Sequence, residues 1–298
     1  MGYGDYSLEA HQAITAARST QPAQQVFSQR SVHPLMIPKG KVRESRDSPD
    51  HPHTTSIVFA LDVSGSMGAI PEQIARKELP GFMKTLLDSG VRDPQVLFMA
   101  LHDAASPDGP LQVGQFESTA ELIDRWLTWT WLIGGGASAF ESYDLAFWFA
   151  AHHLELDSLE KRQKRGYLFM TGDEPCYDKL DRGWVKTYLG DDVGADVPLE
   201  EVIAQAKRTV MPFFLVPDPG RFQNVGAFWT KHLGTAAIGL AAPEDTCPVA
   251  ASLVAIAEGA IRGTKHLRER LRETGYDAAR ADRIVTSIAP WAADHGTP

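Results

Sequence analysis

Residues 57–67, with the sequence IVFALDVSGSM, constrain the fold more than any other part of the chain. An uninterrupted apolar run stops at Asp62, and two serines separated by a glycine follow it. Because a half-exposed strand alternates apolar and polar residues, a continuous apolar run is typical of a strand buried on both faces of a sheet. The sequence therefore predicts a buried strand that leads directly into a polar loop.

The pattern that begins at Thr55 indicates the fold class. Short apolar segments alternate with segments of helical periodicity, which is typical of a mostly parallel sheet with helices on both faces. The third strand follows an SPDGP turn without an intervening helix, so we expect an antiparallel edge strand. We predict an α/β fold, a Rossmann-like three-layer sandwich whose central six-stranded sheet is built from residues 57–61, 96–101, 112–116, 167–171, 213–216 and 236–240.

The segments on either side of this predicted domain, residues 55–263, differ from it in composition. Residues 1–54 begin with a short predicted helix and continue into a charged, proline-rich stretch. That stretch is compatible with a mobile linker or with an extended arm packed on the domain. Residues 264–298 carry apolar residues at helical spacing, which predicts a helical extension whose apolar sides pack on the domain or on another protein.

The charge and hydropathy of the chain limit its partners. A formal net charge of -9 repels nucleic acids and anionic membranes. The longest apolar runs fall far short of the ~18 residues that span a bilayer, and the N-terminus lacks a signal-peptide pattern. The 2 cysteines are too few for a disulfide framework. We expect a cytoplasmic protein that binds neither nucleic acid nor membrane.

Three polar loops are expected to converge at one edge of the sheet. Residues 62–66 directly follow the first strand, residues 134–138 directly precede a strongly apolar helix, and residues 171–174 directly follow the fourth strand. In an open parallel sheet, ligands bind outside the carboxyl ends of the strands. Carboxylates and hydroxyls without His or Cys favour a hard divalent cation, Mg²⁺ or else Mn²⁺ or Ca²⁺. Because serines add little negative charge around the ion, it can still attract a carboxylate from another molecule.

The first and third loops resemble the metal-ion-dependent adhesion site of von Willebrand factor A domains. DVSGSM matches the DxSxS motif of that family at Asp62, Ser64 and Ser66, and Asp173 in FMTGDE matches the aspartate of its third loop. The family supplies a threonine from the second loop, which GGGASAFES lacks, so either Ser138 provides the hydroxyl or water replaces it. The resemblance covers about residues 55–263, and a narrower one links the chain to uncharacterised bacterial intracellular proteins built around such a domain.

The resemblance implies a function in protein association. The metal of this family usually mediates binding between proteins, and bacterial intracellular members often work beside MoxR-type AAA+ ATPases. We therefore predict a non-enzymatic adaptor in which a divalent cation captures an Asp or Glu side chain of a partner.

Two alternatives remain open at this stage. A strand that ends in aspartate also resembles the nucleophile of a phosphohydrolase, which would use Asp62. Ser64 then stands where such enzymes carry a carboxylic acid, and it cannot act as one. In the other alternative, the metal site is vestigial and the helical extensions bind the partner.

Overall fold

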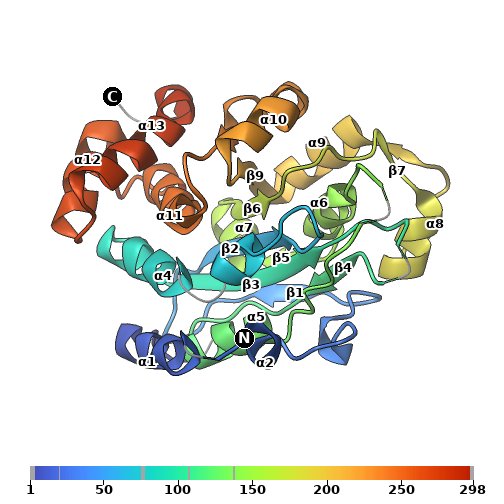
Figure 1. Ribbon diagram of the computed structural model, residues 1–298, viewed down its shortest axis with the longest axis horizontal. Helices are drawn as coiled ribbons and strands as arrows, with labels where there is room; N and C mark the ends of the chain where they lie inside the picture. Colours follow the sequence, from blue (N-terminus) through green and yellow to red (C-terminus); the bar gives the residue numbers. More distant parts are fainter. Residues whose placement is uncertain (1–3, 20, 75–77, 107, 137, 296–298) are drawn as a thin grey trace.

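The computed structural model describes residues 4–295 except residues 20, 75–77, 107 and 137. Its main feature is a six-stranded sheet in the order β10-β9-β6-β2-β3-β4 (Figure 1). All neighbouring strands are parallel except β3 and β4, so the antiparallel strand lies at one edge. The predicted α/β class is confirmed. The strands are β2 (Thr55–Asp62), β3 (Pro94–Leu101), β4 (Leu111–Val113), β6 (Gly166–Thr171), β9 (Val210–Val216) and β10 (Ala237–Gly239).

Strand β2 lies in the middle of the sheet and contributes to two separate cores. Ile57, Phe59 and Leu61 pack in one core, whereas Val58 and Ala60 pack in the other. Successive side chains of a strand point to opposite faces, so a strand covered on both faces needs apolar residues at every position. The apolar run of β2 is continuous because both faces of the strand are buried.

Helices cover both faces of the sheet. The core on one face includes side chains from α4, α5, α11, α12 and α13, and the core on the other face includes side chains from α6, α9 and α10. The α-helices are α1 (Leu8–Ser19), α2 (Ala23–Val26), α3 (Ile70–Gln73), α4 (Leu79–Asp88), α5 (Ala120–Thr128), α6 (Tyr143–His152), α7 (Asp157–Arg162), α8 (Arg182–Trp184), α9 (Leu199–Thr209), α10 (Pro219–Leu233), α11 (Thr246–Ala257), α12 (Gly263–Glu273) and α13 (Ala278–His295). Short helical turns are η1 (Pro34–Met36), η3 (Val185–Leu189), η4 (Gly234–Ala236) and η5 (Pro243–Asp245).

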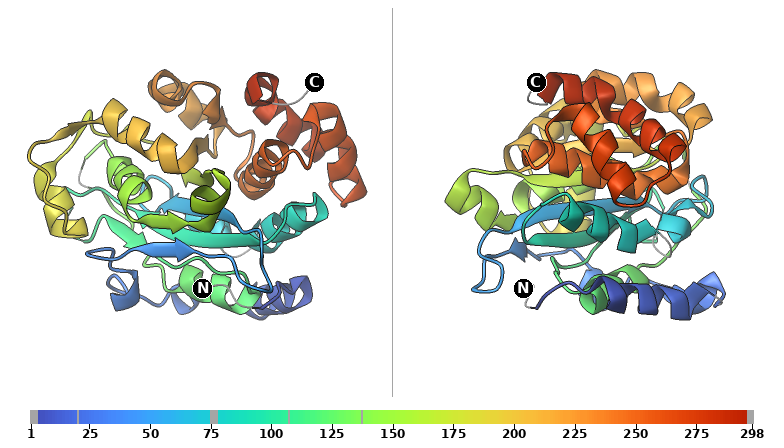
Figure 2. Two further views of the ribbon diagram at one scale, coloured as in Figure 1. Left: turned by 180° about the vertical axis from the view of Figure 1, so that it is seen from behind. Right: turned by 90° about the vertical axis from the view of Figure 1, so that its left-hand side faces the viewer.

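The segments at the two ends of the chain pack on the sheet domain. Strand β1 (Arg43–Ser45) of the N-terminal arm pairs in parallel with β5 (Leu154–Leu156), and Met36 is fully buried. The arm is therefore an extended, packed segment rather than a loose linker. At the other end, α13 contacts α11 and α12, and its Trp291 is buried in the same core. Figure 2 shows the blue N-terminal helices and the red C-terminal helices on opposite sides of the molecule.

Two details of the sheet differ from the sequence-based prediction. The third strand was predicted over residues 112–116, but β4 ends at Val113, and pairing with β3 resumes only at an isolated bridge between Val96 and Glu117. A second small sheet pairs β7 (Lys179–Leu180) with β8 (Val197–Pro198), which the sequence did not indicate. Among the described helices, none has the length and apolarity needed to cross a membrane.

Candidate metal centre

The polar loops meet at the carboxyl edge of the sheet. Strands β2 and β6 are parallel neighbours, so the chain leaves both at the same edge. Asp62 is the last residue of β2, and Asp173 follows the end of β6 by two residues. The glycine loop lies beside them, held by a hydrogen bond from the amide of Gly134 to the carbonyl of Val63 (2.9 Å).

A line of hydrogen bonds joins three of the predicted ligands. Ser64 Oγ lies 2.9 Å from Ser66 Oγ, and the Ser66 hydroxyl donates to Asp173 Oδ1 at 2.8 Å. Ser64 and Asp173 are buried, whereas Ser66 is exposed. The fold thus brings these oxygens together and leaves one of them facing solvent.

Asp62 lies fully buried behind the serines, and both of its carboxylate oxygens accept hydrogen bonds. Oδ1 accepts from the backbone N–H of Ser64 (2.8 Å), and Oδ2 accepts from the hydroxyl of Tyr143 (2.6 Å). Burial raises the pKa of the Asp62 carboxyl to about 6, and the charge of Asp173 adds to the rise, while the hydrogen bonds from Ser64 and Tyr143 oppose it. Asp62 therefore positions the loop, and each oxygen keeps a lone pair for a further partner.

Two glycines allow the loops to approach one another. A Cβ atom on Gly65 would lie 2.7 Å from the backbone nitrogen of Gly135, closer than van der Waals contact permits. A Cβ atom on Gly172 would lie 2.0 Å from the hydroxyl oxygen of Tyr143. Any larger residue at either position would displace groups that define the centre.

Arg221, in the first turn of α10, forms an ion pair with Asp173. Its Nη1 atom donates to Oδ2 of Asp173, so the two oxygens of this carboxylate are divided between Arg221 and Ser66. Asp218 caps the helix by accepting a hydrogen bond from the backbone N–H of Arg221 (3.0 Å), which fixes where the arginine emerges. No motif in the sequence marks Arg221, and only the fold places it at the candidate centre.

Ser138, the predicted second-loop ligand, is exposed and makes other contacts. Its hydroxyl donates to the carbonyl of Phe140 (3.2 Å) and lies 3.1 Å from the hydroxyl of Tyr177. Tyr177 in turn donates to Oδ1 of Asp103 (2.7 Å). None of the described hydrogen bonds of Ser138 reaches the two serines or the aspartates of the predicted site.

The second loop instead places Glu141 beside Ser64. Glu141 is 2% exposed, and the nearby hydroxyl of Ser64 lowers the pKa of its carboxyl group. Burial raises the pKa of Glu141 to about 9, and the rise is increased by the charges of three nearby carboxyl groups: Asp62, Asp103 and Glu174. Sequence reasoning missed Glu141, although it is the only carboxylate in GGGASAFES.

The geometry of the oxygens fits a small divalent cation. Metal–oxygen distances of ~2.0–2.1 Å place adjacent ligands of an octahedral Mg²⁺ ion about 2.8–3.0 Å apart, whereas the longer bonds of Ca²⁺ require a wider spacing. The separations along Ser64, Ser66 and Asp173 are 2.9 Å and 2.8 Å. Within the described part of the chain, no three His, Cys, Asp or Glu side chains could hold a metal by themselves, so a cation here would depend on the serine hydroxyls.

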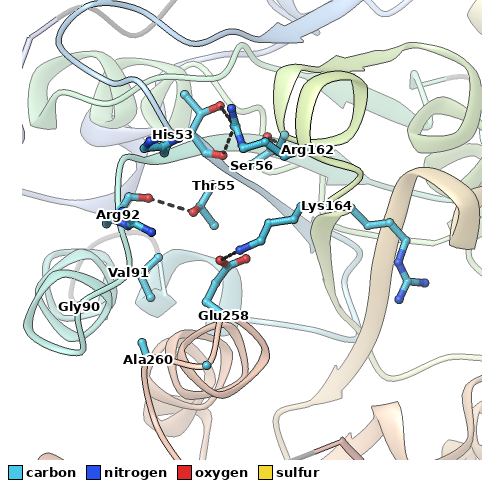
Figure 3. Close-up of a pocket in the computed structure, with 14 residues that line it drawn as sticks. His53, Thr55, Ser56, Gly90, Val91, Arg92, Arg162, Lys164, Glu258 and Ala260 are labelled. Carbon is cyan, nitrogen blue, oxygen red and sulfur yellow. Dashed lines mark hydrogen bonds and ion pairs between the residues drawn. The ribbon is translucent and has the colours of Figure 1, made fainter.

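A separate pocket of about 410 Å³ lies at the opposite, amino edge of the sheet (Figure 3). Several cationic side chains line it, and two of them have acidic partners within the chain. Arg162 binds Asp47, and Lys164 binds Glu258. The pocket therefore does not present a free cationic surface formed by Arg162 and Lys164.

Comparisons with known proteins give only distant structural likenesses. No family model matches the chain, and no curated protein matches its sequence. The pilus adhesin SpaC from Lactobacillus rhamnosus GG is similar at 10% identity and a TM-score of 0.43, covering 73% of this chain and 32% of that one. Proximal thread matrix protein 1 from the mussel byssus has 11% identity and a TM-score of 0.43, covering 71% and 50%. A von Willebrand factor type A structure from Catenulispora acidiphila has 11% identity and a TM-score of 0.34, covering 68% and 42%.

The chain thus spans half or less of the length of each of these proteins. At such identities and TM-scores, the likenesses assign no activity. The α/β class of this chain follows from its own strand pairing.

Proposed function

We propose that this chain is a metal-dependent protein-binding module of the von Willebrand factor A type, in which a divalent cation at Asp62, Ser64, Ser66 and Asp173 binds a carboxylate of a partner. The observation that carries the proposal is the convergence of Ser64 Oγ, Ser66 Oγ and Asp173 Oδ1 at the carboxyl edge of the sheet, where contacts of 2.9 Å and 2.8 Å link these three hard oxygen atoms. Together with the DxSxS motif, this convergence supports Mg²⁺ as the cation and Mn²⁺ as a substitute.

The residues of the centre have distinct tasks in this proposal. Ser64, Ser66 and Asp173 hold the cation, and Asp62 holds the loop that presents them. When bound, the cation supplies a positive charge and an exchangeable coordination position. Arg221 provides a second positive charge beside Asp173, and its side chain is partly exposed. An acidic partner would therefore meet two cationic groups at a largely buried site.

The geometry gives less support to the alternatives. An aspartyl nucleophile needs a free oxygen that a phosphoester can reach, whereas Asp62 is 0% exposed and accepts a hydrogen bond at each oxygen. We therefore propose no catalytic role. The helical extensions bury their apolar residues within this chain, as Leu267 and Trp291 show. That packing leaves them less apolar surface for a partner.

Metal titration tests the proposal directly. We expect Mn²⁺ to bind the wild-type chain and Asp173→Asn to lose at least ~10-fold in affinity, because the substitution removes a charged ligand. Asp196→Asn is the matched control, since it removes a surface carboxylate that pairs with Lys179 away from the centre. Isothermal titration calorimetry gives the affinities. Equal affinities for wild type and Asp173→Asn would refute the proposed site.

The partner can then be sought by metal dependence. A pull-down from native lysate, with Mg²⁺ in one arm and EDTA in the other, should retain the partner only in the presence of metal. A MoxR-type AAA+ ATPase, the partner class implied by the sequence resemblance, is the first candidate to look for. Retention that is equal in both arms would point to binding through another surface.

A further inference from the structure

Glu141 is held between the first and third loops with part of its carboxylate unsatisfied. Its backbone N–H donates to the carbonyl of Pro175 (3.2 Å), and it forms an isolated parallel bridge with Cys176. Ser64 lies near enough to lower the pKa of its carboxyl group, while Oε2 is buried without a hydrogen-bond partner in the described structure. These backbone contacts hold residue 141 against the third loop, and the side chain is 2% exposed.

The surroundings of Glu141 hold more negative charge than the described ion pairs neutralise. Four further carboxyl groups lie around the centre: Asp62, Asp103, Asp173 and Glu174. Among the described ion pairs, Arg221 with Asp173 is the one that involves this group. Burying an unpaired carboxylate costs far more than burying a neutral polar group, so a proton or a cation must balance this charge.

The contacts place Glu141 at one end of a row of oxygens. Ser64 lies close enough to Glu141 to lower the pKa of its carboxyl group, and contacts of 2.9 Å and 2.8 Å continue the row from Ser64 to Ser66 and from Ser66 to Asp173. We propose that Glu141 is a direct ligand of the divalent cation and takes the second-loop position that the sequence had assigned to Ser138. This inference rests on the proposed function, because it assigns a ligand to the same cation.

The assignment changes the electrostatics of partner capture. A carboxylate at this position adds a negative charge to those of Asp62 and Asp173, whereas a serine there would leave the ion with more positive charge. The cation would then hold an approaching acidic side chain mainly through a directed coordination bond at short range, and Arg221, which pairs with Asp173, is a positive group beside it. Such a site would select its partner by the position of the partner's carboxylate as well as by its charge.

Glu141→Gln tests the assignment against a closely matched control. The control is Glu117, which is also buried, at 6% exposure, and whose Oε2 atom also lacks a hydrogen-bond partner. It lies near the start of β3, away from the carboxyl edge of the sheet, and its Oε1 atom accepts a hydrogen bond from Trp126 (3.0 Å). We expect Glu141→Gln to lower Mn²⁺ affinity by ~10-fold or more, since even residues that only support a ligand cost 10–100-fold when changed. Glu117→Gln should bind Mn²⁺ within about twofold of wild type.

Thermal unfolding in EDTA supplies an independent readout. If Glu141 serves the cation, its neutral amide variant should unfold at or above the wild-type temperature in EDTA and gain less from added Mn²⁺. Wild-type Mn²⁺ affinity in Glu141→Gln, alongside a loss in Asp173→Asn, would overturn the Glu141 assignment alone. Absence of Mn²⁺ binding in the wild type would overturn the proposed function as well. If Glu141→Gln does not fold, Ser138→Ala provides the test. Wild-type Mn²⁺ affinity in Ser138→Ala would support Glu141 as the ligand, and a tenfold loss of Mn²⁺ affinity would refute that assignment.

Discussion

The hydrogen bond from Tyr143 to Asp62 offers the sharpest test of how the centre is held together. The phenol donates to Oδ2 of Asp62 at 2.6 Å, and both residues are fully buried. Tyr143→Phe removes the hydroxyl and leaves the ring in its packing against Phe214 and Trp229. The substitution therefore isolates one hydrogen bond and creates almost no cavity.

The expected cost follows from the charge of the acceptor. A hydrogen bond to an ionised group contributes about 1.5–3 kcal/mol, compared with about 0.5–1.5 kcal/mol for a neutral pair. Because the pKa of Asp62 is raised to about 6, the carboxyl is mainly ionised at pH 8 and mainly protonated at pH 5. We expect Tyr143→Phe to lower the free energy of unfolding by about 2 kcal/mol at pH 8 and by less at pH 5. Removing a bond that favours the carboxylate also raises the pKa of Asp62 further, which works in the same direction.

Urea unfolding in EDTA at pH 8 and pH 5 measures the loss in free energy of unfolding at each pH. Tyr167→Phe is the control, because its hydroxyl also donates to a carboxylate, Glu258 at 2.8 Å, but at the opposite edge of the sheet. The control should leave Mn²⁺ affinity unchanged, whereas Tyr143→Phe should reduce it. A loss of less than about 0.5 kcal/mol in the free energy of unfolding of Tyr143→Phe at pH 8 would refute the view that Tyr143 stabilises an ionised Asp62. A loss at pH 5 equal to that at pH 8 would refute it as well.

Two further predictions concern the backbone and the pH dependence of stability. Gly65→Ala should destabilise the chain by about 1–3 kcal/mol and weaken Mn²⁺ binding, because the new Cβ would meet the backbone of Gly135. The control Gly81→Ala in α4, where nothing lies within 4 Å of the new Cβ, should be neutral or stabilising. Denaturant midpoints and calorimetry measure both effects, and equal behaviour of the two variants would contradict the prediction. Burial raises the pKa of Asp144 to about 8, so the folded chain keeps a proton that the unfolded chain loses near pH 4, and stability in EDTA should fall as the pH rises from about 4 to 8. Asp144→Asn should flatten this fall, and an unchanged pH profile would count against a protonated Asp144.

The sheet was predictable because its strands are long enough to show a pattern. β2 and β3 are buried at every position, and their apolar runs in the sequence follow from that burial. The prediction for the edge strand was too long: beyond Val113 one further hydrogen bond joins the amide of Gly114 to the carbonyl of Phe98 in β3, and the regular strand then ends. A strand of two residues, such as β7, is too short for periodicity to reveal.

The candidate centre was predictable to the level of loops rather than side chains. Asp62 and Asp173 follow strands that were correctly predicted, and parallel pairing then requires their loops to meet. The second loop is irregular, so the sequence could not show which side chain points inward. Phe140 stacks on Tyr177 at the surface, and this contact leaves Ser138 outside while Glu141 turns into the protein. The sequence thus directed attention to the hydroxyl of Ser138, which the fold leaves exposed, and not to the buried carboxyl group of Glu141.

Arg221 explains how so acidic a centre can be stable before a cation binds. It pairs with Oδ2 of Asp173 and leaves Oδ1 to accept from Ser66, so one carboxylate serves both a permanent cation and the row of hydroxyls. Hydrogen bonds already hold the two serines beside Asp173, so the proposed cation would need little rearrangement of the serines. Arg221 pairs with neither Asp62 nor Glu141 among the described contacts, and the raised pKa of Glu141 means that it keeps a proton near neutral pH. A divalent cation in the centre would displace that proton and take over the balancing of the carboxylate.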